Sequence, residues 1–207
     1  TFTFPQPPQG TVAVSWSGSH GIRDQAGNPF DGGSWNYLLD TNQVAVVISE
    51  IMYHPDSENP LEEYIELFNR SGSPVNLRGW RFSDGVQFTF PDATIAANGY
   101  LVVAADLAAF RKKYPGVVNV IGNWTGILSN SREDIDLDDA QGNRVDSVRC
   151  ADEGDWAVRR RGPQDRGHRG WEWLAEHDGL GKSLELINPN LSNNNGQNWA
   201  SSLVAQG

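Results

Sequence analysis

The chain has 207 residues, of which 16 are basic and 26 acidic, and its formal net charge is −10. This acidity argues against binding to nucleic acid or to an anionic membrane, because both require clustered positive charge. The single cysteine, Cys150, excludes an internal disulfide and leaves the redox compartment open. No apolar run approaches the roughly 18 residues of a membrane helix, so we expect no membrane span.

Residues 1–40 carry three predicted strands, at 1–4, 11–16 and 34–39. Three strands cannot close a sandwich. We therefore expect the missing strands to come from preceding sequence or from another chain. The exposed edges of these strands could pair between chains, so an oligomer is one of the alternatives. The chain begins inside a predicted strand, so we expect it to belong to a longer protein.

The motif at residues 21–30, GIRDQAGNPF, is followed by WNY at 35–37. Together they resemble the last strands of bacterial immunoglobulin-like repeats, which are stalk and adhesion modules of surface proteins. The resemblance implies that residues 1–40 are the C-terminal strands of such a domain and that they act as a spacer. Asp24 is open to two interpretations, a calcium ligand or a side chain that caps its own turn, and we favour the cap.

Residues 44–156 have the strand spacing of a sandwich, with seven or eight predicted strands. An apolar run covers 44–52, and at 63–68 the alternation places Tyr64 and Glu66 on one face and Ile65 and Leu67 on the other. The other predicted strands lie at 80–83, 86–90, 100–104, 134–138 and 144–148. The one predicted helix is 107–114, with Asp106 as its N-cap.

This block resembles the lamin-tail domain, an immunoglobulin-like β-sandwich. The segments that carry the resemblance are ISEIM at 48–52, EYIELFN at 63–69, VNLRGW at 75–80, FP at 90–91, GYLVV at 99–103 and DDAQGNRVDSV at 138–148. The resemblance implies an interaction module without catalytic residues. The predicted fold class is all-β: a lamin-tail-type immunoglobulin-like β-sandwich at 44–156, a partial Ig-like segment at the N-terminus and an irregular C-terminal extension at 157–207.

Glu50 and Glu66, on two successive predicted strands, suggest an acid–base pair. We favour a structural role, because buried carboxylates are costly unless they are hydrogen-bonded. Arg70, Arg78 or Arg81 are the expected partners. A preformed pocket that united Glu50, Glu66 and a histidine would contradict the non-catalytic interpretation.

The extension shows little strand periodicity before a predicted strand at 183–187, and we expect it to pack on the sandwich. Its three tryptophans and the one just before it are expected to add buried area: Trp156, Trp171, Trp173 and Trp199. Its arginines suggest a sulfated or phosphorylated polymer as ligand, although neighbouring acidic residues favour internal ion pairs. Exposed tryptophans stack on sugars, but for Trp171 and Trp173 we favour core packing. The candidate ligand-binding residues are Arg159, Arg160, Arg161, Arg169, Trp171 and Trp173.

Residues 134–139 imitate the start of an EF-hand loop, which makes Asp136, Asp138 and Asp139 candidate metal ligands. However, Asp139 occupies the position that requires glycine, and Val145 the position that requires glutamate. We favour a strand and a hairpin, expect no cofactor and leave calcium open. Cys150 with His168 or His177 is the only thiol–imidazole combination, and no catalytic residue is predicted.

The sequence therefore predicts a non-catalytic interaction or adhesion module of a larger bacterial surface or secreted protein, located outside the cell or at its surface. The alternatives are a carbohydrate-binding module assisted by calcium, and an accessory domain of a secreted hydrolase or nuclease. The expected partner is a protein or a polysaccharide, with no nucleic acid.

Overall fold

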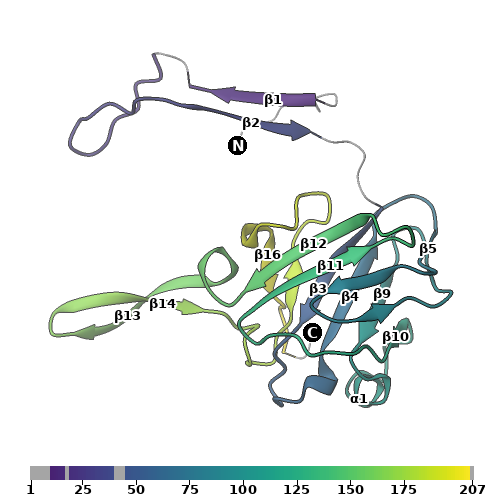
Figure 1. Ribbon diagram of the computed structural model, residues 1–207. Coiled ribbons are helices and arrows are strands. Elements are labelled where there is room, and N and C mark those ends of the chain that lie inside the picture. Colours follow the sequence, from purple (N-terminus) through teal and green to yellow (C-terminus); the bar gives the residue numbers. More distant parts are fainter. Residues whose placement is uncertain (1–9, 17–18, 40–44, 206–207) are drawn as a thin grey trace. The chain divides into compact units, whose positions relative to one another are not determined.

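The computed structural model describes residues 10–16, 19–39 and 45–205 (Figure 1). The predicted strand at 1–4 lies outside these residues. The chain divides into two compact units, Thr1–Gln43 and Val44–Gly207. In the described part of the chain, no helix is long and apolar enough to cross a membrane.

The N-terminal unit contains one antiparallel pair, β1 (Gly10–Ser15) with β2 (Ser34–Leu39). This confirms the second and third predicted strands. Between them, Asp24 Oδ1 accepts hydrogen bonds from the backbone N–H groups of Ala26 and Asn28, both at 2.9 Å. Asp24 therefore caps its own turn, as the sequence predicted.

The second unit is a sandwich of two sheets (Figure 1). The larger sheet has the strand order β10-β9-β4-β3-β15-β16, and its strands are antiparallel except for β9 and β10. Its strands are β3 (Val46–Met52), β4 (Tyr64–Asn69), β9 (Tyr100–Ala104), β10 (Val120–Gly122), β15 (Leu184–Leu186) and β16 (Trp199–Ser201).

The smaller sheet has the order β12-β11-β6-β7, and a separate pair joins β5 to β8. These strands are β5 (Val75–Asn76), β6 (Arg81–Asp84), β7 (Phe88–Thr89), β8 (Thr94–Ile95), β11 (Arg132–Asp138) and β12 (Arg144–Ala151). The expected count of seven or eight strands was too low, because β3 to β12 make ten. Three short strands were missed, β5, β8 and β10, which are too short to show alternation.

Alternate side chains of the strands point into the core between the sheets, and a bulge in β3 determines which of its side chains do so. Val46 and Ile48 point into the core, and so does Ile51, because the register shifts between Ile48 and Glu50. The extra residue reverses the alternation. Glu50 therefore escapes the core that an unbroken strand would force it into.

The opposite face of the larger sheet is partly covered by helix α1 (Leu107–Lys113), which lies close to a 3-10 turn at Pro60–Glu62. Phe110 of α1 is buried with Met52 and Tyr64 in a second, smaller apolar cluster. The Asp106 side chain accepts a hydrogen bond from the Ala109 N–H at 2.8 Å, which confirms the predicted N-cap.

The C-terminal segment is part of the sandwich and also contains an unpredicted hairpin. β15 pairs with β3, and Trp199 is buried in the main core, where its indole N–H donates to the Asn193 carbonyl at 2.8 Å. The expectation of little strand structure before residue 183 was wrong, because β13 (Val158–Asp165) and β14 (His168–Leu174) form an antiparallel hairpin.

The C-terminal segment should unfold together with the sandwich. Replacing Trp199 with alanine removes a buried ring from the main core, so we expect a loss of about 3–5 kcal/mol in unfolding free energy. Urea denaturation followed by circular dichroism measures it. The control is Leu203→Ala, which changes a side chain that is 93% exposed. A Trp199→Ala variant as stable as this control would contradict the described packing.

Candidate functional site

The β13–β14 hairpin extends outward from the sandwich (Figure 1). Its tip is a two-residue turn in which Arg166 and Gly167 both have positive φ, 46° and 85°. Such a turn matches the twist of the two strands. Both faces of the hairpin are largely exposed, so the hairpin contributes little to the core.

One face of the hairpin collects most of the candidate ligand-binding residues. In the strand register, Arg159 lies opposite Trp173, Arg161 opposite Trp171, and Gln164 opposite Arg169. Residues that face each other across a pair lie on the same side of the sheet. This surface, which we call the Arg/Trp face, therefore consists of Arg159, Arg161, Gln164, Arg169, Trp171 and Trp173. In the hairpin, which is described in full, no carboxylate lies on this face.

Stacking holds two of these arginines in place. The guanidinium carbon of Arg159 lies 4.3 Å from the centroid of the Trp171 ring, and that of Arg161 lies 5.4 Å from it. The fourth arginine of the candidate set, Arg160, points to the other face. There its Nε lies 3.5 Å from Glu172 Oε2.

The expectation of core packing for the two tryptophans was wrong, and the expectation of internal ion pairs holds for Arg160 alone. Trp171 and Trp173 are 55% and 47% exposed, so neither packs in the core. Among the ion pairs of the described residues, the candidate arginines contribute only the Arg160–Glu172 pair. Internal pairing therefore does not account for Arg159 and Arg161. Both alternatives that favour a ligand gain support, namely an anionic polymer at the arginines and a sugar at the tryptophans.

A groove with a volume of about 650 Å³ lies at the base of the Arg/Trp face. It is lined by two tryptophans, Trp156 and Trp173, and by polar side chains on several segments. The charged and amide side chains of this lining are those of Arg132, Asp134, Arg149, Glu153, Asp155, Asn194 and Asn195. Trp173 belongs both to the hairpin face and to the groove, so the two surfaces are continuous.

A close backbone approach shapes the groove. Gly196, at the start of the 3-10 turn Gly196–Asn198, lies against the turn Gly154–Trp156. A Cβ at Gly196 would come within 2.5 Å of the Asp155 carbonyl, so only glycine fits. The contact brings Asn194 and Asn195 beside Trp156, whose ring centroid lies 5.9 Å from that of buried Trp199.

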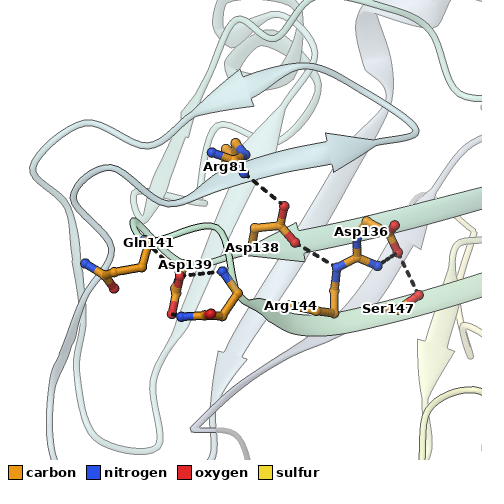
Figure 2. A network of polar contacts seen from close by, with 8 residues as sticks. Arg81, Asp136, Asp138, Asp139, Gln141, Arg144 and Ser147 are labelled. Atoms are coloured by element: carbon orange, nitrogen blue, oxygen red, sulfur yellow. Dashed lines mark hydrogen bonds and ion pairs between the residues drawn. The ribbon is translucent and has the colours of Figure 1, made fainter.

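The candidate metal ligands are engaged by other groups (Figure 2). Arg144 forms ion pairs with Asp136 and with Asp138, whose Oδ1 lies 2.7 Å from the Arg144 Nε. Asp139 accepts the Gln141 and Asn143 N–H groups, the arrangement that Asp24 also makes in its own turn. Among the described residues, no group of three or more His, Cys, Asp or Glu side chains is arranged to hold a metal ion.

Glu50 and Glu66 lie on the open part of the larger sheet, where they are cross-strand neighbours. Glu185 of β15 faces Glu50 on its other side, and the three line a hollow of about 310 Å³. The Ser49 hydroxyl donates to Glu66 at 2.8 Å, and the Tyr64 hydroxyl donates to Glu50 at 2.5 Å.

The hydrogen bonds described for these two carboxylates therefore come from hydroxyl groups, not from the expected arginines. Arg81 instead lies 3.4 Å from Asp138, and Arg70 donates to the Pro189 carbonyl. No histidine is among the residues that line the hollow. The hollow therefore unites Glu50 and Glu66 but not the histidine that would contradict the non-catalytic interpretation.

A comparison with protein families identifies the fold. The sequence model of the family described as Lamin Tail Domain matches residues 40–152. The chain belongs to the lamin tail domain family. A comparison with curated proteins found no match. The lamin tail domain has an immunoglobulin-like sandwich fold, which agrees with the two packed sheets and with the fold class predicted from the sequence. The Arg/Trp face lies outside the matched residues.

The family is not known for catalysis, and the chemistry of the one thiol agrees. Cys150 is 1% exposed, and its Sγ lies 3.7 Å from the Glu133 carbonyl oxygen. Burial, together with the charge of Glu133, raises the pKa of the Cys150 thiol to about 12, so it stays protonated at neutral pH. His168, one of its two suggested partners, lies on the exposed hairpin.

An ionic cluster between a loop of the lamin tail domain and the C-terminal segment was not predicted. His54 Nδ1 lies 2.5 Å from Asp178 Oδ1, and its Nε2 lies 3.1 Å from Glu58 Oε1. Burial disfavours the charged imidazole, but the hydrogen bonds with the two carboxylates outweigh burial and raise the pKa of His54. The cluster joins the loop after β3 to the segment before β15. The two loops are far apart in sequence, so no local pattern signals the cluster.

The row of carboxylates should make stability depend on pH. Burial raises the pKa of Glu66 from 4.5 to about 7, helped by the charges of Glu50 and Glu185 and opposed by the Ser49 hydrogen bond. The folded state therefore binds more protons than the unfolded state between these values, and stability falls as pH rises from 4.5 to 7.

Glu66→Gln removes the charge that burial penalises. We expect it to raise the unfolding free energy on the order of 2 kcal/mol above pH 7, and to have little effect below pH 4.5. Urea denaturation at pH 4, 6 and 8 measures the difference. Glu153→Gln, at an exposed position, is the control. An effect of Glu66→Gln that is equal at all three pH values would refute the explanation.

Proposed function

We propose that this chain is a non-catalytic interaction module of a larger bacterial surface or secreted protein, and that the β13–β14 hairpin is its contact element. The observation that carries the proposal is the Arg/Trp face. Two tryptophans about half exposed and three arginines share one face of a hairpin that protrudes from an otherwise complete sandwich.

The composition of this face is that of a binding surface. Tryptophan and arginine are the residues enriched where partners bind most tightly, because each offers a large contact area and directional hydrogen bonds. The N-terminal unit supports the extracellular, bacterial part of the proposal through its resemblance to bacterial immunoglobulin-like repeats.

A second candidate function is carbohydrate binding. The groove favours it, because Trp156 and Trp173 lie among side-chain amides and carboxylates that can bond sugar hydroxyls. This alternative differs from the first in the class of ligand, not in the surface used.

The test is retention of the intact chain on an array of immobilised macromolecules. The array carries matrix proteins such as collagen, neutral polysaccharides and acidic polysaccharides, and it is read at low and high salt. We expect retention on at least one class, with no shortening of the ligand. The Trp171→Ala/Trp173→Ala variant should lose it by about tenfold or more.

The matched control is Trp16→Ala, which removes a tryptophan that is 44% exposed in the N-terminal unit. Retention that survives in the hairpin variant would contradict the choice of surface. Chemical turnover of a retained ligand, or no retention on any class, would contradict the function.

A further inference from the structure

We infer that the ligand of the Arg/Trp face and its groove is an acidic polysaccharide, a polymer of sugar rings that carry carboxylates. This inference rests on the proposed function and names its ligand class. Two adjoining surfaces of different character carry it: one is cationic and the other is aromatic and rich in hydroxyl-binding groups.

The cationic part is a preorganised ladder. Arg159 and Arg161 are two residues apart on one strand, which separates them by about 7 Å along the hairpin. Contact with the Trp171 ring restricts both guanidinium groups, so that less side-chain entropy is lost when a ligand binds. A guanidinium group accepts a carboxylate through two parallel hydrogen bonds. Arg169 continues the same face toward the tip of the hairpin.

The groove provides what a sugar ring requires. Trp173 and Trp156 offer apolar ring faces, while Asn194 and Asn195 offer both hydrogen-bond donors and acceptors. Asp134, Glu153 and Asp155 accept hydrogen bonds from hydroxyl groups. Because Trp173 is shared, one chain of sugar residues can pass from the groove onto the arginine ladder.

The hairpin disfavours a nucleic acid, which is the other anionic polymer with stackable rings. On the hairpin, the guanidinium of Arg159 already lies over the Trp171 ring, where a base would have to stack. A polysaccharide whose rings carry both hydroxyl groups and carboxylates fits both surfaces, because the groove holds Arg132 and Arg149 among its hydroxyl-binding groups.

The experiment uses the intact chain and isothermal titration with oligogalacturonate of defined length. The first comparison is the methyl ester of the same oligomer, which keeps the rings and removes the charges. We expect the ester to bind at least about tenfold more weakly than the acid form, because the bidentate arginine contacts are lost. Binding of the acid form should also weaken with salt.

The second comparison uses charge-matched variants. Arg159→Ala/Arg161→Ala should weaken binding of the acid form by about tenfold and leave binding of the ester unchanged. Arg78→Ala/Arg111→Ala, which removes two exposed arginines elsewhere, should match the parent chain. Trp173→Ala should weaken binding of both forms.

Three results would overturn the inference. The first is equal affinity for the acid and its ester, and the second is tighter binding of single-stranded poly(dT) than of oligogalacturonate. The third is retention of a matrix protein through the hairpin with no polysaccharide bound, which leaves the proposed function intact and rejects only the ligand class. An absence of any hairpin-dependent binding would reject both.

Discussion

The partly buried carboxylate of Asp146 joins two parts of the lamin tail domain to the C-terminal tract. It lies on β12, and its Oδ2 accepts the backbone N–H of Ile48 in β3 at 2.7 Å and the side-chain amide of Asn193 at 2.7 Å. Burial raises the pKa of Asp146, although both hydrogen bonds oppose that effect. The cost of burying this group is offset only while both donors are in place. One carboxylate therefore links β3, the smaller sheet and the C-terminal tract.

The C-terminal tract that Asp146 holds lies next to the start of the hairpin. The C-terminal tract returns to the sheet as β15 and β16, and Gly196 packs it directly against the Gly154–Trp156 turn. The hairpin leaves the sandwich just after that turn, at Val158, and the chain rejoins the larger sheet at Leu184 of β15. The surface that we propose for recognition lies beyond the residues that match the family.

Much of the sandwich followed from the sequence because one face of each long strand is buried. The alternation at Tyr64, Ile65, Glu66 and Leu67 appears in the structure as two separate apolar clusters, one on each side of the sheet. The bulge at Ser49 was not predictable, because hydrogen bonding between strands, not local composition, decides it. The signals that could have located the hairpin were the tight turn at Arg166 and Gly167 and the alternation in Trp171-Glu172-Trp173.

Those signals are weak for a physical reason. Both faces of the hairpin meet solvent, so its strands carry arginine and glycine where a strand is normally recognised by buried apolar residues. Tryptophan is usually mostly buried, which favoured the core for Trp171 and Trp173. The sequence supplied the right residues for the candidate surface but could not show that Arg160 turns away, or that Trp156 and Asn194 meet in one groove.

The most direct test of the account is an NMR titration of the intact chain with oligogalacturonate, following the indole N–H signals and the backbone amides. The account predicts that the indole signals of Trp171, Trp173 and Trp156 shift together, along with the amides of β13 and β14. The indole of buried Trp199 and the amides around Glu50 and Glu66 should stay in place. Shifts centred on Glu50, Glu66 and Glu185 would instead place binding at the acidic hollow of the larger sheet, and they would contradict the proposed role of the Arg/Trp face.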